Sequence, residues 1–386
     1  PPCSVAYDFG RNVGSVLVDA RVYTVLRGLA TASATVTVQR PSKFRTPRQI
    51  PASDIGDNTY AVGDLTGDGR PDVISCGSAS VWLNAGNAQG FYDPPLPVLT
   101  VGCLSVRLYD MNQDGRKDIV VLRNRAVQTY IWTPGGYVLA PAYTALLNSS
   151  ANAKLLDFAV GDLNGDGLQD AVASQSDTSG SDIYVLLNSP AGFLPVVAYG
   201  RVGAIRSVEI ADIDRDLDLD VVLGRAGAGQ EYLTTYINDG LGNFGAGRDS
   251  VTGFGSPNFV AVGDITGDSY PDIVAGVAVT NPPGPDQVVV MAGDPSNPGF
   301  FALERPTVIG DELVSGISVG DLEGDGTLEA IVSFESANDV MVVRRQSLGM
   351  YTVDRYVGIR ANHLPKLVDA DGDGDASVAT GGTDCN

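Results

Sequence analysis

Seven short acidic stretches recur along this chain at nearly regular intervals. They begin at Asp64, Asp110, Asp162, Asp212, Asp264, Asp321 and Asp369, so successive starts are 46 to 57 residues apart. The best preserved copy reads VGDLNGDGLQD, from Val160 to Asp170. Repeats of about 50 residues are typical of stacked or radial architectures, and their secondary structure decides between the two.

The segments around each acidic stretch read as β-strands. A short alternating segment such as FAVGDL or ISVGDL precedes the stretch, and a compact β-branched run such as DIVVL or DVVLG follows the first six copies. A third apolar segment comes next, and a turn then leads to an aromatic residue, as at Phe193. With no helical periodicity, four strands per repeat predict an all-β fold, a seven-bladed β-propeller of four-stranded antiparallel blades.

Both ends of the chain contribute to the predicted ring. The last acidic stretch is followed by only one strand, while residues 33–50 look like a third and fourth strand with no acidic hairpin before them. Joining residues 33–50 to residues 364–382 would complete the last blade and close the ring with strands from both termini. The predicted propeller domain therefore spans residues 33–386. Residues 1–32 form a separate N-terminal segment, interpreted as an extra strand pair or a cap.

The acidic loops have the composition of cation sites. Oxygen-bearing side chains fall at positions 1, 3, 5 and usually 9 of each loop, and position 7 can offer its backbone carbonyl. Ca²⁺ prefers six to eight oxygen ligands from carboxylates, amides, carbonyls and water. Without a cation, three or four carboxylates this close would repel one another. Seven copies in register therefore predict up to seven Ca²⁺ ions, with the pattern best preserved in the first five loops.

The predicted ligands follow the same positions in every loop. In the first three loops they are Asp64, Thr66, Asp68, Arg70 and Asp72; Asp110, Asn112, Asp114, Arg116 and Asp118; and Asp162, Asn164, Asp166, Leu168 and Asp170. In the next two they are Asp212, Asp214, Asp216, Asp218 and Asp220, and Asp264, Thr266, Asp268, Tyr270 and Asp272. In the last two they are Asp321, Glu323, Asp325, Thr327 and Glu329, and Asp369, Asp371, Asp373 and Asp375.

Composition excludes two classes of partner. The formal net charge of −21 argues against nucleic acid, which requires a basic surface. No apolar run is long enough for a transmembrane segment.

Four cysteines suit an oxidising compartment. We expect a Cys76–Cys103 disulfide between adjacent blades and a Cys3–Cys385 disulfide between the termini, with free buried cysteines as the alternative.

The loop residues resemble the FG-GAP/VCBS repeat family, whose calcium-loop repeats also occur in integrin α-subunit propellers. The resemblance covers roughly residues 58–380 and rests on the VGDxxGDGxxD core, with the integrin-like words DFG at Asp8 and FGSPNFVAVGD at Phe254. It implies a seven-bladed, calcium-binding propeller, usually extracellular, that binds proteins or carbohydrates. Some relatives are fused to enzymes that act on polysaccharides or lipids, or are such enzymes.

Catalytic motifs are missing from the sequence. His363 is the only histidine, and the chain has no Gly-x-Ser-x-Gly elbow, P-loop or dinucleotide fingerprint. We therefore expect no catalysis. The sequence favours an extracellular recognition or adhesion module that binds a protein or glycan through the loops opposite the calcium loops. The alternatives are a structural subunit or spacer of a cell-surface assembly, as part of a longer chain, and a polysaccharide lyase or hydrolase.

Two further features bear on the binding face. The loops between second and third strands carry irregular insertions, at residues 174–182, 224–231, 277–287 and 335–339. Variable loops on a rigid scaffold often bind ligands. Trp82, Trp132 and Tyr236 lie on third strands, where core packing is a more common role than stacking against a glycan.

Overall fold

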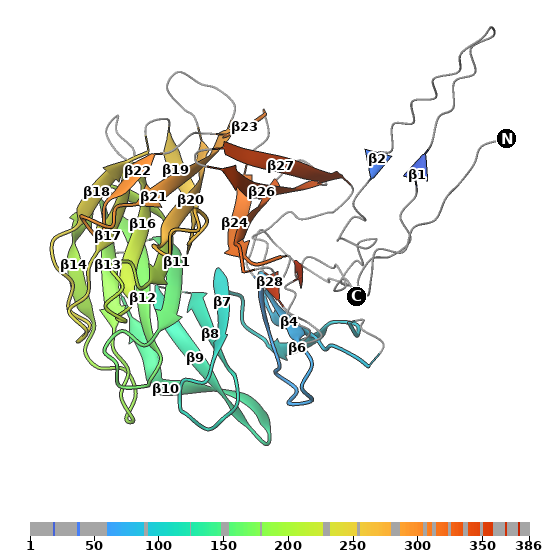
Figure 1. Cartoon of the computed structure of the whole chain (residues 1–386). Coiled ribbons are helices and arrows are strands. Elements are labelled where there is room, and N and C mark those ends of the chain that lie inside the picture. The colour runs from blue at the N-terminus through green and yellow to red at the C-terminus, as the bar shows by residue number, and fades with distance from the viewer. Residues whose placement is uncertain are drawn as a thin grey trace, which may run out of the picture.

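The computed structural model describes most of the repeat region. The described residues are 18–19, 37–38, 60–88, 92–123, 125–147, 154–177, 180–226, 232–252, 255–278, 286–303, 307–310, 314–322, 326–334, 339–347, 350–357, 367–368 and 377–378. Within them the chain is all β (Figure 1). Accordingly, no helix in this part of the chain could cross a membrane.

Six antiparallel sheets follow one another along the chain, each built from consecutive strands. The first consists of β3 (Tyr60–Gly63), β4 (Asp72–Cys76), β5 (Val81–Asn84) and β6 (Leu96–Leu99). The second consists of β7 (Ser105–Tyr109), β8 (Asp118–Arg123), β9 (Ala126–Thr133) and β10 (Gly136–Leu146). The third consists of β11 (Lys154–Gly161), β12 (Asp170–Asp177), β13 (Gly180–Leu186) and β14 (Val197–Val202).

The remaining three sheets repeat this order. The fourth consists of β15 (Ala204–Ala211), β16 (Asp220–Ala226), β17 (Tyr232–Tyr236) and β18 (Arg248–Val251). The fifth consists of β19 (Ser256–Gly263), β20 (Asp272–Ala278), β21 (Asp286–Gly293), β22 (Phe301–Leu303) and β23 (Thr307–Gly310). The sixth consists of β24 (Val314–Gly320), β25 (Glu329–Phe334), β26 (Asp339–Ser347) and β27 (Met350–Val357). Because β22 and β23 both pair with β21, they are two pieces of one outer strand.

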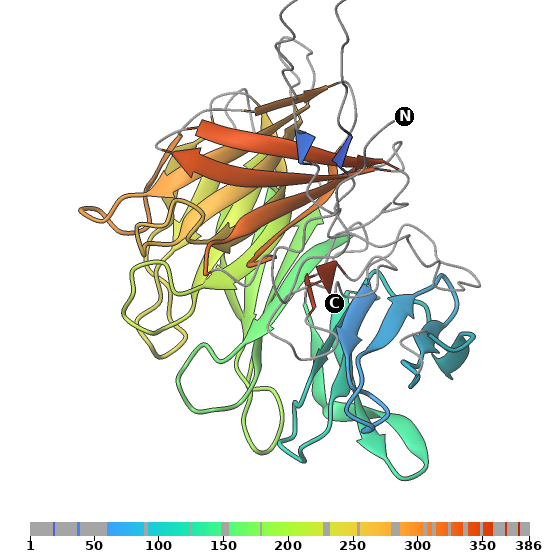
Figure 2. The same cartoon turned by 45° about the vertical axis from the view of Figure 1, so that its right-hand side comes forward.

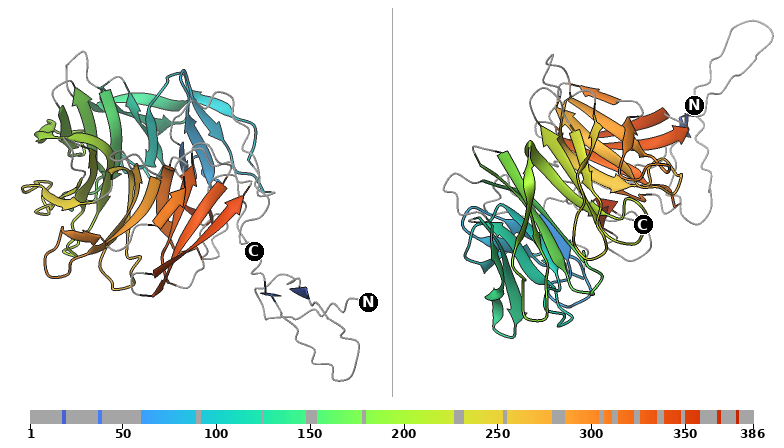
Figure 3. Two further views of the ribbon diagram at one scale, coloured as in Figure 1. Left: turned by 90° about the horizontal axis from the view of Figure 1, so that it is seen from above. Right: turned by 90° about the vertical axis from the view of Figure 1, so that its left-hand side faces the viewer.

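The sheets are arranged radially. The first strand of each sheet lies next to the first strand of the following sheet, in the series β3, β7, β11, β15, β19 and β24. Seen from above, the sheets succeed one another around a common axis, from blue through green to red (Figure 3). Each first strand is thus the inner strand of its sheet, as in a propeller blade.

Packing between neighbouring sheets forms the core. Second strands are buried along almost their whole length, because each lies inside its own sheet and is covered on both faces by other sheets. Between the fourth and fifth sheets, for example, Val222 and Leu233 form one cluster with Val260, Ile273 and Val289. The β-branched runs that follow each acidic stretch are therefore the sequence signature of these buried strands.

The two ends of the chain are described only in short pieces. β28 (Leu367–Val368) pairs with β29 (Ser377–Val378), which places the last acidic stretch between two strands, as predicted. β2 (Thr37–Val38) pairs with β1 (Val18–Asp19) instead of extending that hairpin. β28 lies beside β24 and close to the first sheet (Figures 1 and 2). The described residues do not close a ring, so closure by both termini and the count of seven blades stay predictions.

Candidate metal centres

The first six acidic stretches all occupy the same structural position. Each joins the first strand of a sheet to the second, and position 9 is the first residue of the second strand. In every sheet this residue pairs with the last residue of the first strand, as in Gly63↔Asp72 and Gly161↔Asp170. The six loops therefore lie at equivalent ends of their sheets.

Position 1 curls the loop around its own carboxylate. In all six loops this aspartate accepts a hydrogen bond from the backbone N–H of position 6, at 2.7–3.1 Å. Position 6 has φ between 72° and 84° in each case. Glycine adopts this conformation without cost. Leu217 and Ser269 occupy it in the fourth and fifth loops, where the chain accepts an unfavourable backbone conformation to keep the same curl.

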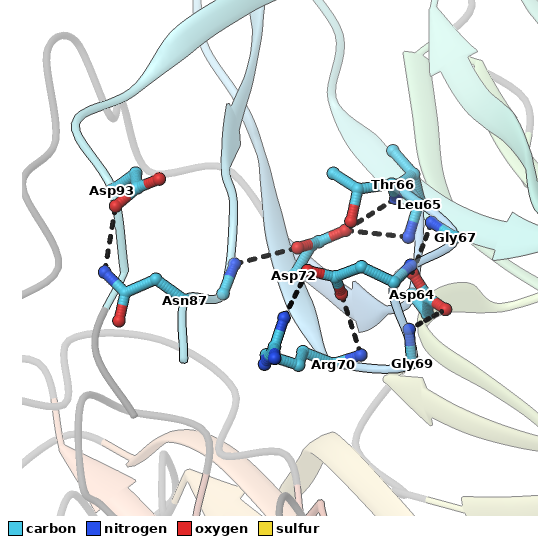
Figure 4. Close-up of polar contacts among 11 residues, drawn as sticks. Asp64, Leu65, Thr66, Gly67, Gly69, Arg70, Asp72, Asn87 and Asp93 are labelled. Carbon is cyan, nitrogen blue, oxygen red and sulfur yellow. Dashed lines mark hydrogen bonds and ion pairs between the residues drawn. The ribbon is translucent and has the colours of Figure 1, made fainter. Parts of the chain in front are cut away.

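Position 5 tightens the second half of the loop. Its carboxylate accepts the N–H of position 7 at 2.8–3.0 Å in the first five loops. Figure 4 shows the position 1 arrangement in the first loop, where Asp64 faces the amides of Gly67 and Gly69. The side chains at positions 1 and 5 therefore point into the loop that they organise.

Position 9 has a different environment from the other acids. Asp72, Asp118, Asp170, Asp220 and Asp272 are fully buried, and Glu329 is 4% exposed. In the first five loops, one oxygen accepts an N–H from position 2 or 3 and the other accepts an N–H near the end of the third strand. This acid thus connects its own loop to two strands. Because each carboxylate oxygen can accept more than one bond, capacity for a cation remains.

Burial leaves these acids short of compensating positive charge. Desolvation raises the pKa of Asp118, Asp170 and Asp220 to about 6 in each case, against the opposing effect of their backbone hydrogen bonds. Burial also raises the pKa of Asp272. The neighbouring acids of each loop add repulsion. A cation in the loop would relieve both effects.

The fourth loop gathers its carboxylates most closely. Oxygens of Asp212, Asp214 and Asp216 lie within 4.8 Å of one another, the only such group of three among the described residues. Asp212 Oδ1 and Asp214 Oδ1 are buried and have no hydrogen-bond partner, which is costly for a carboxylate. Desolvation, followed by the charge of Asp216, raises the pKa of Asp214. Thr266 Oγ1, at position 3 of the fifth loop, is likewise buried without a partner. These oxygens fit a Ca²⁺ site, because hard oxygen donors are the ligands this ion takes.

The other predicted ligands fall into three groups. Asn112 and Asn164 direct their amide nitrogens toward the position 5 acids Asp114 and Asp166, at 3.1 Å. Position 7 varies most: Leu168 is buried, whereas the Arg116 guanidinium stacks on Trp132, 3.8 Å from the ring centre. Six predicted ligands lie outside the described residues, namely Glu323, Asp325, Asp369, Asp371, Asp373 and Asp375.

Two buried asparagines were missed by sequence reasoning. Asn188 and Asn238 lie two residues after the third strands of their sheets. Their side-chain amides donate to Met111 O and Leu163 O in the loop of the preceding sheet. The sequence did offer one indication of their role, because each asparagine directly follows a third-strand apolar run, VLL and TYI respectively. These residues link neighbouring loops to each other.

The opposite end of the sheets carries the predicted disulfide. Cys76 and Cys103 are bonded, with their Cα atoms 5.4 Å apart, and so connect the end of β4 to the segment that enters the second sheet. Cys3, Cys385 and His363 lie outside the described residues, as do parts of all four long insertions. Tyr236 packs in the core between the third and fourth sheets, as expected for a third-strand aromatic.

Comparisons with known proteins agree with this architecture. The sequence matches the FG-GAP-like repeat family three times, over residues 64–121, 110–173 and 162–223. No curated protein sequence matches the chain.

Two solved structures share the fold at low sequence identity. One is a lectin from Agrocybe aegerita described for specific recognition of non-reducing terminal N-acetylglucosamine, with 18% identity, a TM-score of 0.54, and 77% of this chain and 79% of the lectin covered. The other is BBS1N in complex with ARL6DN, with 13% identity, a TM-score of 0.54, and 87% and 96% covered. Residues 64–223 thus carry three FG-GAP-like repeats, and these repeats lie in radially arranged antiparallel sheets.

Proposed function

We propose that this protein is a non-catalytic, extracellular recognition module built on a calcium-stabilised β-propeller. The observation that carries the calcium part is the cluster of Asp212, Asp214 and Asp216, with two buried oxygens that no protein group satisfies. A bound Ca²⁺ supplies the positive charge that these oxygens lack. The residues at positions 1, 3 and 5 would hold it, and the position 9 acid fixes the loop beneath them.

The proposed ring has seven blades. Its last blade starts with β28 and β29, because these strands enclose the seventh acidic stretch and β28 continues the series of inner strands beside β24. Residues 33–50 would add its outer strands. A cysteine pair engineered between residues 33–50 and 367–378 tests the closure: crosslinking supports it, and failure of every pair contradicts it.

The proposed partner is a protein or a glycan bound at the end of the propeller opposite the calcium loops. The disulfide holds two blades together at that end. Arg225 there lies over Tyr232, 5.4 Å from the ring centre, and pairs with Asp249 at 2.7 Å. Aromatic and charged groups on a rigid frame are suited to recognition. The Agrocybe aegerita lectin supports a glycan as one class of ligand, since a similar scaffold there recognises a sugar.

A glycan array combined with affinity capture from extracellular fluid tests recognition. Binding that is retained in Arg70→Ala, on the calcium-loop side, and lost in Tyr232→Ala supports the proposed face. Binding that is lost only in Arg70→Ala would place the ligand at the wrong end. If no ligand binds and the protein instead cleaves a polysaccharide, the recognition proposal is wrong and the protein is an enzyme.

A further inference from the structure

A continuous chain of hydrogen bonds joins the second and third acidic loops. Asp118 Oδ2 accepts the Met111 N–H at 3.0 Å, and Met111 O accepts Asn188 Nδ2 at 3.0 Å. The Asn188 N–H then donates to Asp170 Oδ1 at 2.6 Å. The position 9 acids of two neighbouring loops are thus connected through the backbone of Met111 and through Asn188.

The same links continue from the third loop to the fourth. Asp170 Oδ2 accepts the Leu163 N–H at 2.9 Å, Leu163 O accepts Asn238 Nδ2 at 2.7 Å, and the Asn238 N–H donates to Asp220 Oδ1 at 2.8 Å. Asn188 is 1% exposed and Asn238 is 4% exposed. A buried network of this kind is rigid, because breaking any link leaves polar groups unpaired in the interior.

Among the described residues, no asparagine link of this kind joins the fourth loop to the fifth. Gly293 stands where Asn238 stands in the fourth sheet, and its N–H donates to Asp272 Oδ1 at 3.0 Å. It has no side chain to reach the fourth loop, and a Cβ there would lie 2.4 Å from Pro271 O. Arg215 of the fourth loop does lie over the Tyr270 ring of the fifth, 5.0 Å from its centre, but this contact is not a buried asparagine link. The fifth loop therefore serves as an internal reference without that link.

A second contact joins the second and third loops at the surface. Gln113 Nε2 donates to Gly167 O at 2.9 Å, and Gly167 is position 6 of the third loop, whose N–H binds Asp162. Gln113 has φ of 58°, a conformation suited to glycine. Both contacts reach atoms that set the shape of the third loop.

We propose that calcium binding is coupled among the loops that start at Asp110, Asp162 and Asp212, with Asn188 and Asn238 as the positioning residues that transmit it. The inference rests on the proposed calcium function. An ion that fixes the third loop also fixes Asp170 and Leu163, and through Asn188 and Asn238 it orders Met111 and Asp220 for the next ions. Coupling of this kind typically changes affinity about 5- to 150-fold.

Hydrogen exchange measured by mass spectrometry during a calcium titration reads each loop separately. Asp166→Asn weakens the third loop at an exposed position. We expect it to raise the calcium concentration for half-protection at least about 5-fold in the Asp110 and Asp212 loops and to leave the Asp264 loop unchanged. Adding Asn188→Ala should reduce the effect on the Asp110 loop, where the Gln113 contact remains, and keep the effect on the Asp212 loop. The matched control is Asn243→Ala, at an exposed asparagine in the turn after β17 whose side chain bonds Asp239. It should leave the effect of Asp166→Asn on both loops unchanged.

Gln113→Gly provides a second test at an exposed site that should not disturb folding. It should reduce the effect of Asp166→Asn on the Asp110 loop at least about twofold. If Asp166→Asn leaves the calcium midpoints of the Asp110 and Asp212 loops unchanged, the proposed coupling is wrong. It is also wrong if neither Asn188→Ala nor Gln113→Gly changes the effect of Asp166→Asn on the Asp110 loop. If calcium protects no loop of the wild-type chain, the proposed calcium function itself fails. Protection of every loop with independent midpoints overturns the coupling alone.

Discussion

The side-chain amide of Asn238 donates a 2.7 Å hydrogen bond to the backbone carbonyl of Leu163, 75 residues earlier in the preceding sheet. Its own backbone N–H binds Asp220 at 2.8 Å. One residue therefore holds two acidic loops at once. The loops of this protein are parts of the interface between blades as well as hairpin turns.

Replacing Asn238 by alanine should destabilise the folded chain even when calcium is saturating. The Leu163 carbonyl would lose this buried partner, which costs about 1–3 kcal/mol. Chemical denaturation should show this loss, whereas Asn243→Ala, in the exposed turn of the same hairpin, should stay within about 0.5 kcal/mol of wild type. Equal losses in the two variants would contradict a role for Asn238 between blades.

Positions 5 and 9 of a loop should respond differently to loss of charge. Asp170→Asn presents an amide to two backbone N–H donors and should destabilise the calcium-free protein by about 2–3 kcal/mol. Asp166→Asn, at an exposed position, should act mainly on the stabilisation that calcium adds. Denaturation curves with and without chelator separate the two. If Asp170→Asn and Asp166→Asn are equally stable in chelator, position 9 has no structural role separate from calcium binding.

The calcium-free protein should become more stable on mild acidification. The folded pKa of Asp118, Asp170 and Asp220 is about 6, above the usual value for aspartate of about 3.9. When the pKa of an acid is higher in the folded than in the unfolded state, its protonation stabilises the folded state. This stabilisation is fully present below the unfolded-state pKa and is lost as the pH rises through the folded-state pKa. The melting temperature of calcium-free protein should therefore rise from pH 7 to pH 5. With calcium bound, protons compete with the ion for the carboxylates, so acidification should lower the melting temperature.

The pH experiment has its own contradicting outcome. A melting temperature of the calcium-free protein that falls steadily between pH 7 and pH 5 would mean that the buried acids are compensated without an ion. Asp68, whose pKa is lowered first by its bond from the Arg70 backbone, is exposed and should contribute little.

Removal of the disulfide should weaken the junction between the first two blades. Cys76→Ser with Cys103→Ser opens a link between residues 27 apart, and the loss of chain restriction predicts about 2–4 kcal/mol of destabilisation. A reducing agent should lower the melting temperature of wild type and leave the double variant unchanged. Insensitivity of wild type to reduction would show that the bond adds nothing to stability.

Local patterns in the sequence predicted much of the fold. Alternation before each loop and the β-branched runs after it identified the first and second strands, because a buried strand needs such residues wherever it lies. Positive φ at Gly69, Gly115 and Gly167 followed from the tight curl of the loops. The Cys76–Cys103 pair followed from where strands end.

Other features depend on contacts between distant residues. The recurring acid at position 9 was predicted only as a metal ligand, because its bonds to third-strand amides arise from sheet pairing. Asn188 was overlooked because its partner Met111 lies 77 residues earlier. Leu217 in a left-handed conformation contradicts local preference, and the surrounding loop enforces it. The pairing of β2 with β1 was likewise not anticipated from the fit of residues 33–50 to the last hairpin.

Calcium content measured together with thermal stability tests the central claim most directly. Protein dialysed against calcium-containing buffer and then desalted should carry several calcium ions per chain by elemental analysis. Its melting temperature should fall on chelation and recover when calcium is restored. A chain that retains no calcium and melts at the same temperature in chelator would contradict the account.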